Sequence, residues 1–194
     1  MVLTTLQHLI NAKIFIQMKR NVVVFGLISG VVLAVFSMIV TWQCYKNEDF
    51  ESNMLLGYTF MLAAFSSIFV GIKSYRDKHN MGVISFGKAF KIGLLITLIA
   101  STFYVVAWLF EYYLIIPDFM DRYTAHTMKE FVAGGATPQE ISLKESEMQG
   151  YVEMYKNPAY VVLFTYAEVL PIGLVISLIS ALILKRKSAD RAGL

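Results

Sequence analysis

The stretch "YAEVLPIGLVISLISALILKRK", Tyr166 to Lys187, decides the fold of this chain. It is mostly apolar until it ends in three basic residues, and it contains one carboxylate, Glu168, and one proline, Pro171. The apolar run begins at Ala159, so it is longer than the roughly 20 residues that cross a bilayer. Backbone polar groups cannot stay unpaired in lipid, and a run of this length therefore predicts a transmembrane helix.

The composition of the whole chain agrees with a membrane protein. Of its 194 residues, 57% are hydrophobic and 16% are charged, whereas soluble domains carry about 25% charged residues. The net charge of +3 is small and scattered, so it does not favour a nucleic-acid partner. The single cysteine, Cys44, cannot form an internal disulfide.

Apolar segments of spanning length occur at four places, 22–42, 54–72, 92–113 and 159–184. The first is longer than a signal-peptide core and no small-residue cleavage site follows it, so we interpret it as a retained helix. We predict an all-α fold in one membrane domain, 1–194: an integral membrane four-helix bundle. Residues 118–158, between helices 3 and 4, form an extracytoplasmic helical hairpin in this prediction.

Lysine and arginine indicate how the chain is threaded. Twelve of them lie before the first span, between the second and third, and after the fourth, against five in the two opposite segments. The positive-inside rule then predicts a multi-pass protein of a bacterial inner membrane with both termini in the cytoplasm. Aromatic residues would mark the outer interface: Trp42, Tyr45, Trp108, Tyr112, Tyr113 and Tyr160.

The outer segment contains signals for two helices. "DFMDRYTAHTMKEFV", residues 118–132, predicts one helix that ends at Gly134–Gly135. Thr137, Pro138 and Glu140 match a helix start with a capping box, and the second helix should run to about residue 156. The hairpin is either a solvated cap on the bundle or a docking surface for a periplasmic partner or ligand. Its apolar seam would comprise Phe119, Tyr123, Phe131, Ile141, Met148, Val152 and Tyr155.

The cytoplasmic loop between the second and third spans, residues 73–93, has the most distinctive sequence in the chain. Asn80–Gly82 predicts a turn, and Ser85 is a suitable N-cap for the helix that becomes the third span. Gly87 and Lys88 do not match the spacing of a phosphate-binding loop.

A family resemblance follows from "GIKSYRDKHNMGVISFGKAFKIGLLITLIAS" (71–101), "PDFMDRY" (117–123), "YKNPAY" (155–160) and "ISLISALILKRK" (176–187). Together these resemble the bacterial membrane family called domain of unknown function 4199, from about residue 19 to 187. The resemblance implies a four-helix inner-membrane protein and brings no activity or catalytic residue with it. Members of this family typically begin near "MKRNV", which here is 18–22. We therefore expect translation to start at Met18; the alternative is that residues 1–17 form a short interfacial helix carrying Leu6, Leu9, Ile10 and Phe15.

Each span carries small residues at a spacing of four, which lets helices approach closely in lipid. We expect these to pack the bundle, although one stripe could instead pair two copies of the chain. The residues are Gly26, Gly30 and Ala34; Ala63, Ser67 and Gly71; Gly93, Thr97 and Ser101; and Gly173, Ser177 and Ala181.

Glu168 is the candidate functional residue of the spans, with Pro171 beside it. It lies eight residues past Tyr160, about 12 Å into the membrane, where a charge costs at least ~2.5–3.5 kcal/mol. One hypothesis is a protonated or hydrogen-bonded group that fixes helix packing. The other is a proton-titrating site with Pro171 as the hinge. Neighbours that could partner it are Tyr104, Ser101, Thr59 and Tyr58. Glu111, in contrast, is expected at the outer edge within reach of water.

No motif indicates catalysis. His8, His79 and His126 are far apart and fall on both membrane sides, and neither a metal-ligand spacing nor a nucleophile elbow occurs. We expect a non-enzymatic membrane protein without cofactor, metal or catalytic residue, a structural or interaction component whose partners are lipid and a second copy or another membrane or periplasmic protein. The alternative is a small transporter or proton-coupled sensor that uses an intramembrane glutamate.

Overall fold

The computed structural model describes the backbone of residues 2–47 and 54–186, and the side chains of residues 14–46 and 55–186. Every regular element in this part is helical, and the only β-type pairing in it is an isolated bridge between Ile84 and Arg186. The elements are α1 (Val2–Asn47), α2 (Met54–His79), α3 (Phe86–Phe110), the π-helix η1 (Glu111–Ile115), α4 (Phe119–Ala133), α5 (Pro138–Tyr155) and α6 (Pro158–Leu184). The predicted all-α class is confirmed.

Four helical stretches of the described chain are long and apolar enough to cross a membrane, as expected for a multi-pass membrane protein. They are Ile14–Lys46, Leu55–His79, Phe86–Ile115 and Pro158–Leu184. Each overlaps one of the four apolar segments found in the sequence.

The four long helices pack around a common core. α3 lies against both α1 and α6, and α2 closes the arrangement by contacting α1 and α6 in turn. Phe65, Ile68 and Ile72 of α2 meet Ile92 and Ile96 of α3, and all five side chains are at most 1% exposed. The core therefore runs along the inner faces of the helices, while large apolar side chains cover their outer faces.

Glycines allow α3 to approach its neighbours closely. A Cβ at Gly26 would lie 2.7 Å from the Cβ of Ile99, and one at Gly30 would lie 2.7 Å from the Cβ of Phe103. On α6, a Cβ at Gly173 would lie 2.4 Å from Cγ2 of Thr97. These distances are shorter than any ordinary carbon contact, so only glycine fits these positions with the helices where they are.

The remaining small residues of the predicted stripes have different surroundings. Ser67 hydrogen-bonds Ser29 across the α1–α2 contact, and Ser177 lies 3.1 Å from Thr97, oxygen to oxygen, across the α3–α6 contact. A Cβ at Gly93 would meet Ser177 at 2.8 Å. Ala63 is exposed on the surface of α2.

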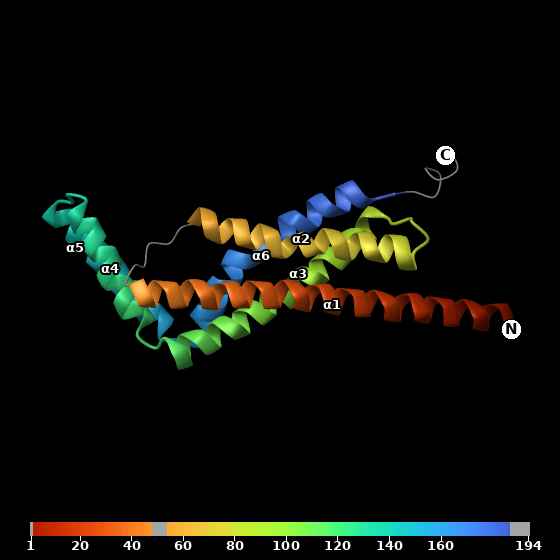
Figure 1. Ribbon diagram of the computed structural model, residues 1–194, viewed down its shortest axis with the longest axis horizontal. Helices are drawn as coiled ribbons and strands as arrows, with labels where there is room; N and C mark the ends of the chain where they lie inside the picture. The colour runs from red at the N-terminus through yellow and green to blue at the C-terminus, as the bar shows by residue number, and fades with distance from the viewer. Residues whose placement is uncertain (1, 48–53, 187–194) are drawn as a thin grey trace.

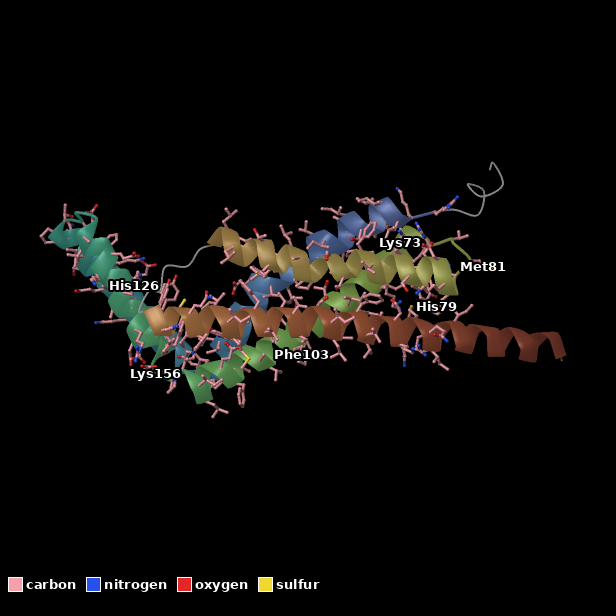
Figure 2. The ribbon with its side chains drawn as sticks, viewed as in Figure 1. Lys73, His79, Met81, Phe103, His126 and Lys156 are labelled. Carbon is pink, nitrogen blue, oxygen red and sulfur yellow. The ribbon has the colours of Figure 1, made fainter. Side chains whose placement is uncertain are left out.

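The two ends of the molecule differ in what they carry. Figure 1 shows the start of α1, the α2–α3 turn and the end of α6 at one end, and the α4–α5 hairpin at the other. Figure 2 places Lys73, His79 and Met81 at the first end and His126 and Lys156 at the second. Below, these are called the turn end and the hairpin end.

α1 is a single helix of 46 residues. At 1.5 Å per residue it is about 69 Å long, which exceeds the roughly 40–45 Å of a bilayer with its headgroups. Its first part extends beyond the other helices at the turn end (Figure 1). Residues 2–17 thus continue the first span rather than forming a separate interfacial helix; the side chains of Leu6, Leu9 and Ile10 lie outside the described set.

The hairpin follows its sequence signals. α4 ends at Ala133 before the predicted Gly134–Gly135 bend, where Gly135 has a φ of +84°. The predicted capping box is present, because the Thr137 hydroxyl accepts from the Glu140 N–H while the Glu140 carboxylate accepts from the Thr137 N–H. Of the predicted seam, Met148 is buried at 4% exposure. Phe119, Tyr123, Val152 and Tyr155 pack on a cluster of Tyr112, Met120 and Val161, so the seam joins the hairpin to the bundle.

Candidate functional site

The end of α3 widens into a π-helical turn at Glu111. The Ile116 N–H donates to the Glu111 carbonyl over 2.9 Å, a bond spanning five residues instead of four. π-helical turns are rare and often occur at functional sites. Here the wide turn buries two consecutive side chains, Glu111 at 2% and Tyr112 at 8% exposure.

Two hydroxyls of α1 hold the Glu111 carboxylate. Ser37 donates to its Oε2 over 3.1 Å, and Thr41, one turn further along α1, donates to the same oxygen over 3.3 Å. The other oxygen, Oε1, is buried and has no hydrogen-bond partner among the described residues. Glu111, Ser37 and Thr41 are called the Glu111 site below.

This burial corrects an expectation from the sequence. Glu111 was expected at the outer edge of the membrane, within reach of water, and the expected access to water is wrong because the side chain is 2% exposed. The position of Glu111 along the chain predicted only how deep in the membrane it lies. The π-helical turn and the long α1 beside it decide which way the side chain faces and what covers it.

A groove of about 540 Å³ lies over the Glu111 site, between the last turns of α1 and η1. Its lining is mainly apolar and aromatic, with Glu111 as the one acid: Met38, Ile39, Thr41, Trp42, Tyr45, Glu111, Ile115 and Ile116. Met38, Ile39, Trp42 and Ile115 are each about half exposed or more, so the groove opens sideways on the surface of the bundle.

Tyr104 of α3 lies near both the Glu111 site and Glu168. Its side chain lies beside Ser37 and interacts electrostatically with both Glu168 and Glu111. Tyr104 was one of the neighbours expected for Glu168. Two other expected neighbours lie elsewhere. Ser101 is buried, and its hydroxyl has no hydrogen-bond partner in the described part of the chain, while Thr59 bonds the Leu55 carbonyl of its own helix.

Glu168 itself is exposed on the surface of α6. Val175 and Ile179, which share its helix face, are 55% and 50% exposed, and we call these three residues the Glu168 face. Pro171 lies within α6, which continues through it to Leu184.

Glu168 also affects Tyr155 at the end of the hairpin. Burial, and second the nearby charge of Glu168, raise the pKa of the Tyr155 hydroxyl.

At the hairpin end, Asp118 ties α4 to α1. The Tyr45 hydroxyl donates to Asp118 Oδ1 over 2.9 Å, and Arg122 Nε donates to Oδ2 over 2.6 Å. The Arg122 guanidinium also lies 4.9 Å from the centre of the Tyr45 ring. The hydrogen bond from Arg122, and then that from Tyr45, lower the pKa of the Asp118 carboxyl.

At the turn end, backbone contacts join the α2–α3 turn to the end of α6. Ile84 and Arg186 exchange two backbone hydrogen bonds, and Arg76 donates to the Leu184 carbonyl over 3.3 Å. Lys88 donates to Asn80 over 3.2 Å and lies over the Tyr75 ring at 5.0 Å. The predicted turn at Asn80–Gly82 and the Ser85 N-cap are confirmed.

Sequence reasoning missed the Glu111 site. A usable signal was present, because Ser37 and Thr41 are four apart on the first span and Glu111 lies inside an apolar run that continues to Ile116. Within the described residues, no group of three His, Cys, Asp or Glu side chains is placed to hold a metal ion.

Comparison with known proteins identifies a family. The model of a family described as "Protein of unknown function (DUF4199)" matches residues 24–186. No curated protein and no solved structure matches the chain.

Proposed function

The chain belongs to the DUF4199 family, and from this premise we propose that it is a non-enzymatic integral membrane protein that serves as an interaction component of a bacterial inner membrane. The observation that carries the proposal is the Glu168 face, a carboxylate on the outer surface of a transmembrane helix.

Exposing a charged carboxylate to lipid has a high free-energy cost. Near the bilayer centre a charged acid costs at least ~2.5–3.5 kcal/mol, and such residues usually face a protein neighbour or water. Within this chain, Glu168 has Tyr104 and Tyr155 nearby, yet its surface stays exposed. A partner helix over the Glu168 face would supply donors and remove the acid from lipid, so the partner is a second copy of the chain or another membrane protein.

The other polar pairs in the spans support a structural role rather than a transport path. Ser29 with Ser67 joins α1 to α2, and Thr97 with Ser177 joins α3 to α6. Each pair connects two helices at one level of the bundle. Bonds of this kind hold helices in register where the surrounding lipid offers no hydrogen-bonding partner.

The proposed orientation places the turn end in the cytoplasm and the hairpin in the periplasm. The support is the charge distribution, because Lys73, Arg76, Lys78, Lys88 and Lys91 all belong to α2, the turn and the start of α3. A cysteine introduced at Gly135, in a Cys44→Ser background, should react with a membrane-impermeant maleimide in spheroplasts. Labelling of this cysteine only after lysis would reverse the orientation.

The test of the partner uses photocross-linking in native membranes. A photoreactive residue replacing Val175, on the Glu168 face, should give a discrete protein adduct. The control is the same residue at Leu163, which is 58% exposed on α6 but about 120° around the helix from Val175, and which should give lipid adducts. Lipid adducts alone at both positions would refute the proposed partner.

A second candidate is a proton-coupled sensor or small transporter, favoured by Tyr104 lying within electrostatic range of both Glu111 and Glu168. A hydroxyl group near two acids could help to pass a proton between them. Proton flux in reconstituted vesicles distinguishes the two functions: flux that disappears in Glu168→Gln supports this candidate, whereas an interaction component gives no flux in either protein.

A further inference from the structure

We propose that the groove over the Glu111 site binds a lipophilic organic cation, a molecule with one positive charge in an apolar body. This inference concerns a different site from the Glu168 face and does not rest on the proposed function. Three features of the groove carry it: an uncompensated acid, an apolar lining and aromatic rings.

The acid has no positive partner within the described chain. Oε2 of Glu111 accepts from the two neutral hydroxyls of Ser37 and Thr41, and Oε1 has no donor among the residues that the structure describes. A buried carboxylate left in this state carries a large desolvation cost. Either a proton or an external cation can offset this cost, and Glu111 is among the residues that line the groove.

The basic side chains beside the groove's aromatic rings, Arg122 and Lys46, do not supply a positive charge to Glu111. Arg122, whose guanidinium lies over the ring of Tyr45, forms an ion pair with the Asp118 carboxylate over 2.6 Å. Lys46 lies over the ring of Trp42 at 5.6 Å, on the last described turn of α1. Neither forms an ion pair with Glu111.

The lining selects against other ligands. A groove of about 540 Å³ falls within the roughly 300–1,000 Å³ of small-molecule sites. Its apolar walls at Met38, Ile39 and Ile115 would exclude a small hydrated ion, which cannot regain its water there. An uncharged acyl chain would leave Oε1 of Glu111 unpaired, and an anionic lipid would be repelled by it.

The rings suit a diffuse positive charge. Trp42 and Tyr45 both line the groove, and aromatic faces attract organic cations through their quadrupoles. Both rings already contact a cationic side chain in this structure. A lipophilic cation would therefore meet the carboxylate on one side and aromatic or aliphatic surface on the others.

The test measures binding of tetraphenylphosphonium to the full chain in a neutral detergent by equilibrium dialysis. The control ligand is tetraphenylborate, which has almost the same shape and the opposite charge. We expect saturable binding of the cation, at least tenfold weaker binding of the anion, and at least tenfold weaker cation binding by Glu111→Gln. Glu145→Gln, on the exposed face of α5, removes the same charge and should bind as the unchanged protein does.

Ile115→Trp keeps the acid and fills the groove, so it should weaken cation binding even if Glu111→Gln does not fold. Circular dichroism and gel filtration check the fold of each variant. The proposal is overturned by equal binding of the two ligands, by undiminished cation binding in a folded Glu111→Gln or Ile115→Trp protein, or by the absence of saturable binding. None of these outcomes affects the cross-linking at Val175, so the two proposals can fail separately.

Discussion

Ser37 and Glu111 are 74 residues apart in the chain, and the Ser37 hydroxyl donates to Glu111 Oε2 over 3.1 Å. This bond joins α1 to the π-helical end of α3, at the level where the hairpin begins. It is the best-defined link between a buried acid and the helix that covers it, and the first prediction tests its contribution to stability.

Ser37→Ala should destabilise the protein by about 1–2 kcal/mol, because it removes a donor from a buried carboxylate. The measurement is the free energy of unfolding in mixed micelles with increasing dodecyl sulfate. Ser66→Ala is the control, since Ser66 is exposed and bonds only the Ala63 carbonyl of its own helix. Equal losses in the two variants would show that the bond to Glu111 adds nothing.

Gly173→Ala should destabilise the contact of α6 with α3. The new Cβ would lie 2.4 Å from Cγ2 of Thr97, and relieving such overlap typically costs about 1–3 kcal/mol. Gly150→Ala in α5 is the matched change, because its Cβ would meet nothing within 4 Å and a helical glycine replaced by alanine gains about 0.5–1 kcal/mol. In the same unfolding assay, the free energy of unfolding should fall for Gly173→Ala and rise for Gly150→Ala. A loss of stability in Gly150→Ala alone would contradict the packing described here.

Docking of α4 should weaken at low pH through Asp118. Its pKa is lowered in the folded protein from the ordinary 3.8, first by the hydrogen bond from Arg122 and then by that from Tyr45. A lowered pKa gives stability that is present above the unfolded value and lost as pH falls through the folded one, here below about pH 4. The fluorescence of Trp108, whose ring is 5.4 Å from that of Phe119 on α4, should report the change.

The measurement uses a Trp42→Phe background, which leaves Trp108 as the single tryptophan. Asp118→Asn should flatten the acid transition of the fluorescence, whereas Asp121→Asn, an exposed acid on the same helix, should leave it in place. An unchanged transition in Asp118→Asn would mean that another group governs the hairpin at low pH.

Thr137→Ala should fray the first turn of α5, with a cost of about 1 kcal/mol for a lost N-cap. It should also raise the pKa of Glu140 part of the way to 4.5, because the backbone N–H and then the hydroxyl of Thr137 lower that pKa, and the substitution removes the hydroxyl. Titration of the Glu140 side chain by NMR measures the shift, and amide exchange measures the fraying. Ser142→Ala, exposed in the same helix, should change neither quantity.

The sequence predicted much of the fold because the controlling forces are local or depend on length. A bilayer demands a long apolar helix, so each apolar run could be recognised without knowing its neighbours. The hairpin could be predicted in the same way, because Gly134–Gly135 ends one helix and Thr137 with Glu140 begins the next within a few residues. These features would look the same in any tertiary arrangement.

The two acids show where that reasoning ends. Each could be placed at a depth in the membrane by counting residues, but the direction of a side chain depends on the helix beside it. Glu111 is buried because η1 turns it towards Ser37 and Thr41 of α1, while Glu168 lies on the exposed side of α6. The sequence by itself determined four apolar helices and a capped hairpin, because hydrophobic length and end-capping act within a segment. Only the tertiary structure decided which acid is covered and which faces outward, because that depends on contacts between residues 70 or more positions apart.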